Sequence, residues 1–491
     1  MKIKRIVIIL LLAAVIVLII FGLYSYRLSI ESSQKNKKVE SEELYPFGFA
    51  GIVEKEELLA AKELKTKIVR EGITWHEIEK KDDVFDFTKL DSGYDKLTSE
   101  YGLQPIVRLK TKQGWGTKCN TTNLKCPSGY KTCPHKSADC PPKDLGGWTN
   151  KGYSPLYYDF VYKILEHAFN TERPINILIV GNEVNSRVFW HGTADEFLKT
   201  RTTVFKAVKD FNSKYKKDVK VSDNGFAGSG PAFIREQYCS GKTEYALRFA
   251  IRNYKRRFTA NQVRNAVQKI DCSNPGRDYT IIKELFKVDE NLGEPSFDYM
   301  AYHFYAPWDT QKEIIDWIKQ EMEKNGYQRP ILQTEGGFGD YINTYNNSAV
   351  AQEVAKEIPK LHVVALANDV KTWLWLPLRE KWGEDFYGPQ YKGLLLPDLT
   401  ELPAFKSYQV MVEKLDGFNK VEQLTGYPVE NIYKFTIKNK SVYVIWTDKT
   451  TKIDLTSELK DQITITGVDG SSTKQKSSTI SIGESPIYVS G

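Results

Sequence analysis

The chain has 491 residues, of which 41% are hydrophobic, and carries a formal net charge of +7. This length exceeds that of one ordinary domain and supplies enough apolar side chains for a large core. Residues 1–38 hold seven Lys and Arg against one Glu, so only about +1 remains for the rest of the chain. The basic balance therefore belongs to the terminus and argues against nucleic acid as a partner of the globular part.

The N-terminus has the features of a membrane anchor. Lys2, Lys4 and Arg5 precede an uncharged run at 6–26, and its 21 residues match the ~20 that span a bilayer. No small-x-small cleavage site follows, and the basic flank places the short N-terminal end in the cytoplasm. We expect a single-pass transmembrane helix at 1–26, a polar tether at 27–43 and the remaining residues outside the cytoplasm. A cleaved signal, the alternative, would release the same body as a secreted protein.

From residue 44 to 416, short apolar runs alternate with stretches of helical periodicity, which is typical of an α/β domain with a parallel sheet. Helical spacing occurs at 90–101, 160–168, 197–211 and 314–322. Strands are predicted at 47–52, 67–70, 105–109, 177–180, 219–221, 299–305, 330–333 and 370–376. Eight strands with helices between most of them predict a (β/α)8 TIM barrel with insertions. A doubly wound sheet, the alternative, usually has a glycine-rich phosphate loop that F-G-F-A-G-I does not match.

Two insertions interrupt the predicted barrel, a Cys-rich loop at 111–148 and a segment at 225–295. The loop holds four cysteines, each seven residues apart: Cys119, Cys126, Cys133 and Cys140. Its composition has no core-forming periodicity, so we expect disulfides to hold it, and Cys239 with Cys272 is a candidate third pair. The alternative is a structural zinc site of the four thiolates, although C-x2-C pairs are absent. The basic run at 248–257 is interpreted as a solvated helix face rather than a contact to an anionic polymer.

After a short helix that ends near Leu415, the pattern changes to β-rich runs separated by turn residues. These runs lie at 442–446, 463–468, 478–482 and 485–489. They predict a small all-β, sandwich-like domain at 417–491.

Polar and charged residues follow several of the predicted barrel strands, at the rim where barrels carry their function. They are Arg70 after the second strand, Asn182 and Glu183 after the fourth, His303 and Tyr305 on the sixth, Glu335 after the seventh and Trp375 on the eighth. Two glutamates on one rim indicate hydrolysis of a glycosidic bond by double displacement. That reaction needs one carboxylate nucleophile and one carboxylic acid, ~5–5.5 Å apart.

These motifs together resemble clan A of the glycoside hydrolases: N-E after strand four, H-x-Y on strand six, T-E after strand seven and W on strand eight. V-R-E-G-I-T-W-H-E-I-E at 69–79 and P-P-K-D at 141–144 also resemble that clan. The resemblance covers residues 46–491, with families five and thirty-nine the nearest, and implies a (β/α)8 retaining enzyme. By position it implies Glu183 as acid/base and Glu335 as nucleophile, without a metal or organic cofactor. Val184 replaces the proline that many relatives have there.

The remaining rim residues are predicted to bind an oligosaccharide or polysaccharide. Arg70 and Tyr305 are suited to keep Glu335 ionised, and Asn182 to bond a substrate hydroxyl. Trp375 offers a flat apolar face for a sugar ring, whereas Trp373 is expected in the barrel wall. Further candidate subsite aromatics are Trp115, Trp148, Trp190 and Trp308.

Each of these residues also has an ordinary interpretation, as a strand-end cap or a packed side chain, and only their joint match favours catalysis. Two alternatives use the same cleft. One is a transglycosylase that remodels a cell-surface polysaccharide, and the other is a non-catalytic carbohydrate-binding surface protein.

Overall fold

The computed structural model describes residues 44–52, 54–112, 114–119, 138–147, 153–338, 348–380, 393–459, 462–476 and 479–491. The predicted anchor and tether lie outside these ranges, as do Cys126, Cys133 and Trp148. Within these ranges, no helix has both the length and the hydrophobicity that a membrane-spanning helix needs.

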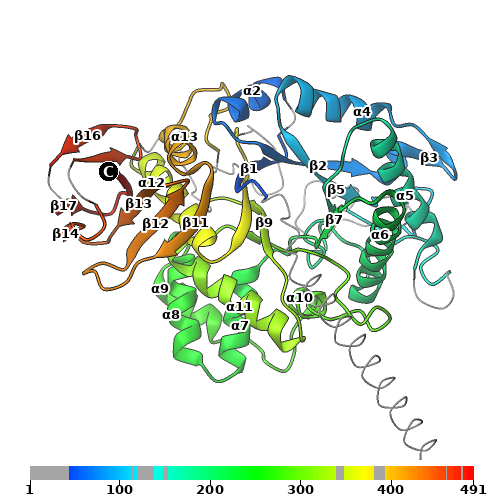
Figure 1. Cartoon of the computed structure of the whole chain (residues 1–491). Coiled ribbons are helices and arrows are strands. Elements are labelled where there is room, and N and C mark those ends of the chain that lie inside the picture. Colours follow the sequence, from blue (N-terminus) through cyan, green and yellow to red (C-terminus); the bar gives the residue numbers. More distant parts are fainter. Residues whose placement is uncertain are drawn as a thin grey trace, which may run out of the picture. The chain divides into compact units, whose positions relative to one another are not determined.

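Eight parallel strands form the central sheet (Figure 1). They are β1 (Phe47–Ala50), β2 (Ile68–Thr74), β5 (Gln104–Lys110), β6 (Ile177–Val180), β7 (Lys220–Ser222), β8 (Met300–Phe304), β9 (Ile331–Gly336) and β10 (Val370–Trp375). Their order in the sheet is β7-β6-β5-β2-β1-β10-β9-β8. Parallel bridges from Ser222 to Tyr299 and from Phe226 to Tyr302 join its two edges and close the barrel. The predicted (β/α)8 fold is therefore confirmed.

The second strand is longer than the sequence pattern suggested. It continues past Arg70 to Thr74, because β2 pairs with β5 in an unbroken register that ends at Thr74 opposite Lys110. The apolar run had been expected to end the strand at Arg70. The continuation E-G-I-T at 71–74 is not an apolar run, so the apolar pattern did not mark it as part of the strand. Arg70 thus lies within the strand and not at its end.

Helices surround the barrel. They are α2 (Lys55–Glu63), α4 (Thr88–Asp95), α5 (Pro155–Asn170), α6 (Ala194–Tyr215), α11 (Gln311–Lys324), α12 (Ser348–Ala367) and α13 (Pro403–Leu415). Helix α5 begins at Pro155 after Ser154, whose side chain accepts a hydrogen bond from the Tyr157 amide. It buries a stripe of residues three and four apart, including Phe160 and Ile164, against the core. Short elements complete the region: α3 (Trp75–Ile78), β3 (Glu79–Lys81), β4 (Val84–Phe85), the π-helical η1 (Lys96–Glu100) and the 3-10 helix η3 (Trp308–Thr310).

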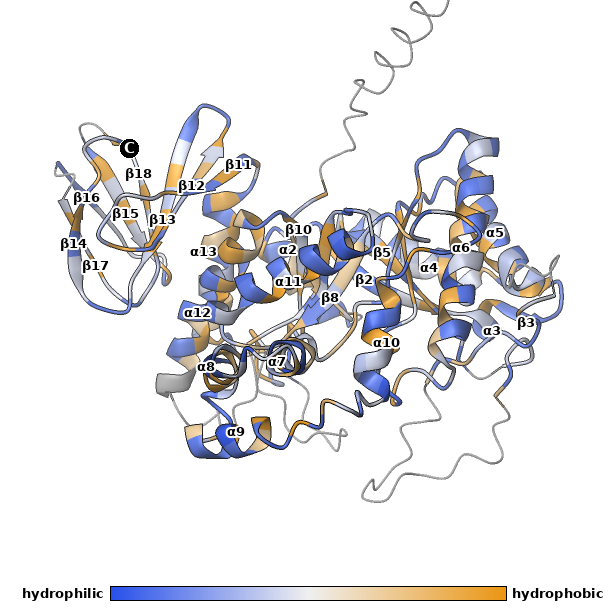
Figure 2. Cartoon of the chain, turned by 90° about the horizontal axis from the view of Figure 1, so that it is seen from below, coloured by the Kyte–Doolittle hydropathy of each residue, from blue (hydrophilic) through white to orange (hydrophobic). Residues whose placement is uncertain are grey.

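The segment 225–295 is helical and follows β7. It forms α7 (Ser229–Cys239), α8 (Thr243–Tyr254), α9 (Ala260–Val267) and α10 (Arg277–Leu285). In Figure 2, α9 and α10 each carry both hydrophobic and hydrophilic residues. The predicted Cys239–Cys272 disulfide is present.

The basic run at 248–257 is not a purely solvated face. Arg252 forms an ion pair of 2.5 Å with Glu313, and Lys255 pairs with Asp309. These acids belong to α11 and to the preceding 3-10 helix, so the run attaches the insertion to the barrel.

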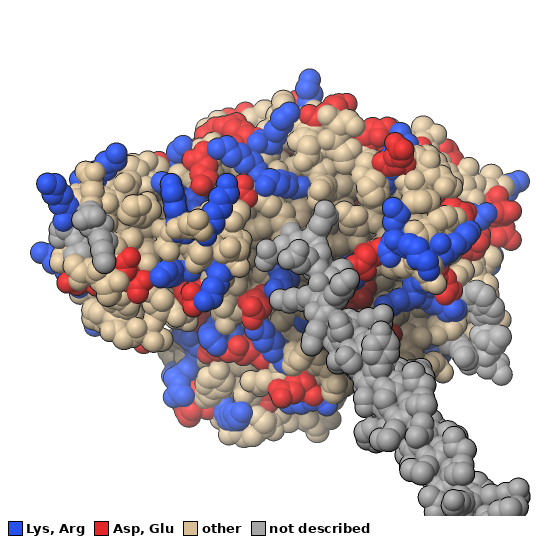
Figure 3. All heavy atoms as spheres, in the orientation of Figure 1, with Lys and Arg blue, Asp and Glu red and all other residues tan. Residues whose placement is uncertain are grey.

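The Cys-rich loop is closed by a disulfide between Cys119 and Cys140. The bond removes two of the four thiolates that the zinc alternative requires, so a four-thiolate zinc site is excluded. On the face shown in Figure 3, basic and acidic side chains are interspersed, as expected for a body whose net charge is small.

The C-terminal region is an all-β unit. A six-stranded sheet has the order β11-β12-β13-β18-β15-β16, and a second sheet pairs β14 with β17. The strands are β11 (Phe418–Gln423), β12 (Asn431–Ile437), β13 (Lys440–Trp446), β14 (Thr451–Asp454), β15 (Ile463–Gly467), β16 (Ser472–Gln475), β17 (Thr479–Ile482) and β18 (Ile487–Ser490). The two sheets share an apolar core that includes Ile432, Ile453 and Ile480. Trp446 meets Trp308 of the barrel edge to face, with ring centroids 5.2 Å apart.

A fully buried ion pair lies behind β7. Arg201 of α6 is 1% exposed and lies 3.1 Å from Asp223, which is 0% exposed. Arg201 also donates to the Leu285 carbonyl and the Ser296 hydroxyl, so α6, β7 and the insertion meet at one guanidinium.

We predict that Arg201→Met lowers the free energy of unfolding by about 3–5 kcal/mol, because the substitution leaves the Asp223 charge buried without its partner. The matched control is Lys199→Met on the same helix, whose pair with Asp195 is exposed. It should cost less than about 1 kcal/mol. Urea unfolding measures both, and equal losses would contradict the prediction.

Candidate active site

The chain turns sharply after β6 and thereby directs Glu183 into the rim. Gly181 and Glu183 both have left-handed backbone conformations, with φ of 72° and 43°. Such a conformation costs a non-glycine residue about 1–2 kcal/mol, so neighbouring contacts must hold it. The Val184 amide donates to Asn224 Oδ1 at 3.2 Å, and the Asn185 side chain exchanges two hydrogen bonds with the Ala227 backbone. The loop after β7 therefore fixes the turn that carries Glu183.

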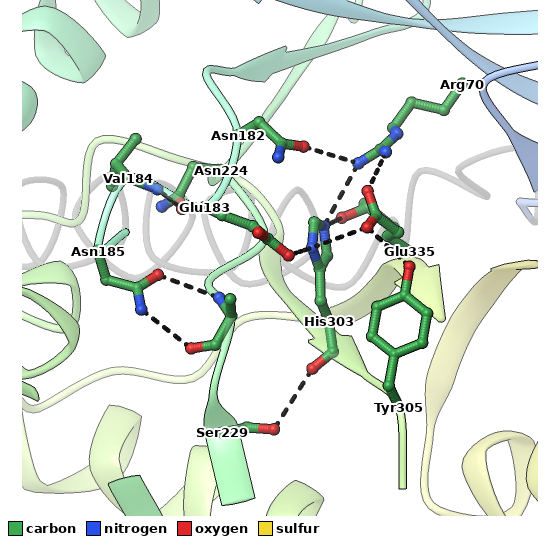
Figure 4. A network of polar contacts seen from close by, with 12 residues as sticks. Arg70, Asn182, Glu183, Val184, Asn185, Asn224, Ser229, His303, Tyr305 and Glu335 are labelled. Carbon is green, nitrogen blue, oxygen red and sulfur yellow. Dashed lines mark hydrogen bonds and ion pairs between the residues drawn. The ribbon is translucent and has the colours of Figure 1, made fainter. Parts of the chain in front are cut away.

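The two predicted catalytic carboxyl groups lie together and both face Nδ1 of His303 (Figure 4). His303 Nδ1 is 2.6 Å from Glu183 Oε1 and 3.8 Å from Glu335 Oε1. One ligand atom of each of the three residues lies within 4.8 Å of the others. The Glu183 and Glu335 side chains are 12% and 13% exposed, so both are largely buried at the rim. This spacing is close to the ~5–5.5 Å of a carboxyl pair that acts by direct attack.

Glu335 is held as a carboxylate. Arg70 Nη2 donates to its Oε2, and the Tyr305 hydroxyl donates to its Oε1 at 2.7 Å. Burial raises the pKa of Glu335, but the positive charges of His303 and Arg70 and the hydrogen bonds from Tyr305 and Arg70 outweigh it. Together they lower the pKa to about 2. Glu335 is therefore ionised across the physiological pH range.

Asn182 is oriented by two arginines. Its Oδ1 accepts hydrogen bonds from Arg70 Nη1 at 3.2 Å and from Arg108 Nη1 at 2.8 Å. The amide oxygen is therefore occupied, and among the described residues Asn182 Nδ2 has no hydrogen-bond partner. A donor NH2 group thus faces the rim beside Glu183.

His303 is enclosed closely on the other side of its ring. Nε2 lies 3.3 Å from Arg70 Nη1 and 3.2 Å from Thr334 Oγ1. Gly225 makes this position possible, since a Cβ there would lie 2.3 Å from His303 Nε2. Its φ of +69° also favours glycine.

Trp375 differs from the prediction. Its side chain is 0% exposed, and its ring lies 6.1 Å from that of His362 on α12. Trp375 is thus packed among other side chains and offers no open face to a sugar in this structure. Trp373 is also buried and stacks on His362 at 4.6 Å, as a barrel-wall residue would.

The other candidate aromatics are also occupied by packing. Trp190 is 2% exposed. Trp115 is partly buried, contacts Trp75 and donates from its indole to the Glu79 carbonyl. Trp308 packs on Trp446. Their roles in sugar subsites stay predictions.

Several residues of the site were not selected from the sequence. Arg108 lies within the predicted third strand P-I-V-R-L, where a charged residue in an apolar run was a usable signal. Asn224 belongs to an N-G pair directly after the fifth strand, a pattern that marks a turn but not the support of another loop. Thr334 and Asn185 adjoin residues that were selected.

The contacts of Glu335 favour a hydrogen-bonded carboxylate over a metal ligand at this position. Glu183, His303 and Glu335 offer three atoms at a spacing that a metal ion would accept. However, both oxygens of Glu335 already accept hydrogen bonds, from Arg70 and Tyr305. A divalent cation there would lie against the Arg70 guanidinium. We therefore keep the prediction that no metal takes part.

No protein-family model matches the chain, and no curated protein matches its sequence. Solved structures do match. A family 39 glycoside hydrolase from the gut symbiont Bacteroides cellulosilyticus WH2 is 13% identical, with a TM-score of 0.59 over 91% of this chain and 81% of that one. The catalytic domain of GH30 xylanase C from Talaromyces cellulolyticus is 10% identical, with a TM-score of 0.53 over 91% and 97%.

A conserved exported protein from Bacteroides fragilis is similar to the same extent, at 13% identity and a TM-score of 0.54 over 92% of this chain and 99% of that one. At identities this low, the structural similarity shows a shared fold and nothing finer. The fold-level resemblance to clan A glycoside hydrolases is therefore confirmed, and family 39 is one of the two that the motifs resembled most.

We predict that Gly225→Ala displaces His303 and lowers the free energy of unfolding by about 2–4 kcal/mol, because the new methyl group overlaps the imidazole and strains the backbone. The control is Gly228→Ala, which has a similar φ of +68° but no neighbour within 4 Å of the added Cβ. It should cost only about 1 kcal/mol. Thermal or urea unfolding measures the difference, and NMR of the His303 ring reports its displacement. Equal costs would show that His303 does not need this space.

Proposed function

We propose that the protein is a retaining glycoside hydrolase that cleaves β-linked carbohydrate by double displacement. The observation that carries the proposal is the carboxyl pair within 4.8 Å, of which Glu335 is kept ionised by Arg70 and Tyr305. Hydrolysis of glycosides needs two carboxyl groups in different protonation states at this spacing. The fold shared with glycoside hydrolases supports the same conclusion.

In the first step, Glu335 attacks the anomeric carbon as nucleophile, and the bond from that carbon to the leaving oxygen breaks. Glu183 gives its proton to the leaving oxygen, so that the aglycone departs as a neutral alcohol. The free Nδ2 of Asn182 is placed to donate to a sugar hydroxyl beside the reacting carbon. Such a bond strengthens as charge develops in the transition state.

In the second step, Glu183 acts as a base. It takes a proton from water, and the resulting nucleophile attacks the anomeric carbon and releases Glu335 as a carboxylate. His303, at hydrogen-bond distance from Glu183, orients its carboxyl group in both steps. Two displacements at one carbon retain its configuration.

The proposed site of action is outside the cytoplasm. The two disulfides Cys119–Cys140 and Cys239–Cys272 fit an oxidising compartment. The sequence at 1–26 supports attachment to the membrane as a single-pass anchor, with a secreted form if that segment is cleaved. The proposed partner is an oligosaccharide or polysaccharide at the cell surface.

We predict that Glu335→Gln and Glu183→Gln each lower kcat/KM by about a thousandfold on unactivated β-linked oligosaccharides. With aryl β-glycosides whose leaving groups need no proton, Glu183→Gln should lower the rate of the first step by a smaller factor. Glu413→Gln, an isosteric change at an exposed surface pair, is the control. Product NMR within the first minutes should show retained anomeric configuration.

Three outcomes have distinct meanings. Equal turnover by wild type and both variants would remove the enzymatic proposal and leave a carbohydrate-binding protein. Inverted products would remove double displacement. Transfer to an added acceptor sugar in preference to water would identify a transglycosylase.

The acid limb of the pH profile tests the role of Tyr305. Glu335 must be ionised, and the charges and hydrogen bonds of its neighbours lower its pKa, so the acid limb should lie below the pH expected for an ordinary glutamate. Tyr305→Phe removes one hydrogen bond to the carboxylate, which raises the pKa of Glu335 and moves the acid limb upward by about one pH unit. Tyr215→Phe, which removes a tyrosine–glutamate bond remote from the rim, is the control. Profiles of kcat/KM with folding checked by circular dichroism provide the measurement. An unmoved limb would contradict the assignment.

A further inference from the structure

A second group of charges lies beside the carboxyl pair, on β5. Arg108 and Lys110 lie two residues apart on this strand and therefore share its inner face. Both side chains extend over Gly72 of the neighbouring strand β2. A Cβ at Gly72 would lie 2.5 Å from Lys110 Nζ and 3.4 Å from Arg108 Nε. The missing side chain at residue 72 thus provides the space in which the two cations meet.

These two cations are not neutralised by partners. Among the described residues, neither Arg108 nor Lys110 forms an ion pair, and Lys110 makes no side-chain hydrogen bond. Arg108 makes one, to Asn182, and its buried Nε has no partner. Arg108 and Lys110 are half-buried, but a buried donor such as Arg108 Nε is costly unless an acceptor arrives from outside.

The nearest acids compensate only partly. Asp139 is buried and already accepts a hydrogen bond from the Lys112 amide. Burial raises the pKa of Asp139, and it raises the pKa of Glu71 to about 7. Glu71 is therefore only partly ionised at neutral pH, and its buried Oε1 has no partner. Positive charge is thus in excess at this part of the rim.

The position of the excess charge relates it to the substrate. Arg108 Nη1 donates to the same Asn182 oxygen as Arg70, and Asn182 directly precedes Glu183. A sugar bound at the carboxyl pair with a hydroxyl on Asn182 Nδ2 would have a neighbouring substituent within reach of Arg108 and Lys110. Guanidinium and ammonium groups prefer carboxylate or sulfate oxygens as acceptors.

We infer that Arg108 and Lys110 form a cationic subsite that binds an anionic group of the substrate. The substrate is then an acidic carbohydrate with a carboxylate or sulfate group at or beside the cleaved sugar. This inference rests on the proposed function and names its substrate class. Arg108 makes the guanidinium contact while it holds Asn182, and Lys110 supplies a second, separable contact.

The test uses the full chain and matched pairs of substrates. One arm compares β-1,4-linked glucuronan oligosaccharides with the same oligosaccharides after reduction of their carboxyl groups. The other arm compares a sulfated β-galactan with its desulfated form. The measured quantity is the ratio of kcat/KM for the acidic form to that for the neutral form. Binding of each oligosaccharide to the Glu183→Gln variant is measured by calorimetry in parallel.

In wild type, the ratio should be about 10 or more in either the carboxylate arm or the sulfate arm, whichever acidic group the subsite recognises. Lys110→Met should reduce that ratio about tenfold. Lys110→Arg, which keeps the charge, should retain most of it. Lys371→Met, at an exposed position near the start of β10, should leave it unchanged. High salt should reduce the wild-type ratio, because it screens the contact.

The pH dependence gives an independent check. Burial, and then the charges of Arg108 and Lys112, lower the pKa of Lys110 to about 8, against the opposing effects of Asp139 and Glu71. Lys110 is charged below this pH and loses its charge above it, while Glu71 becomes fully ionised over a similar range. Both changes remove positive charge, so the ratio should fall between pH 7 and 9. In Lys110→Arg it should fall less.

A ratio near one in both arms, in turnover and in binding, would overturn the subsite while leaving a neutral glycosidase intact. Equal loss on acidic and neutral substrates in Lys110→Met would assign Lys110 a structural role and also overturn it. Absence of all turnover, together with Lys110-dependent binding of the acidic form, would remove the hydrolase proposal and support the subsite.

Discussion

Two carboxyl groups within 4.8 Å repel each other when both are ionised, so their neighbours must supply opposite charge and hydrogen-bond donors. Here Nδ1 of His303 faces both Glu183 and Glu335, and Arg70 and Tyr305 donate hydrogen bonds to the two oxygens of Glu335. The result is an asymmetric pair, with the Glu335 carboxylate stabilised by three residues, Arg70, Tyr305 and His303, and the Glu183 carboxyl group bonded to His303. That asymmetry allows nucleophile and acid/base roles to be divided between chemically identical side chains.

The surrounding fold keeps this arrangement in place. Each charged group of the pair comes from a different barrel strand or from the turn after it, so the closed sheet sets their separation. The left-handed turn at Glu183 is held through Asn224, which donates to Asp223, which in turn pairs with the buried Arg201. A line of polar contacts therefore runs from the outer helix α6 to the turn that carries Glu183. The stability of the fold and the geometry of the site depend on the same buried groups.

The net charge of the whole chain does not show how unevenly the charged residues are distributed. The net charge of +7 arises almost entirely in residues 1–38, and the body is nearly neutral. Nevertheless, Arg108 and Lys110 meet at one part of the rim beside the Arg70–Glu335 pair, and burial raises the pKa of the nearby Glu71 and Asp139. A nearly neutral body can thus present a cationic subsite.

The sequence by itself predicted the fold class and most of the residues that the structure brings together at the candidate site. Eight apolar runs with helical stretches between them predict a closed parallel sheet, and N-E, H-x-Y and T-E lie at the ends of strands, so their side chains are expected at one rim. It could not determine what depends on packing across strands. Burial of Trp375, the space that Gly225 leaves for His303, and the convergence of Arg108 and Lys110 over Gly72 each depend on distances between residues remote in the chain. Local periodicity fixes which face a side chain takes, whereas only the folded chain fixes which neighbours fill the space in front of it.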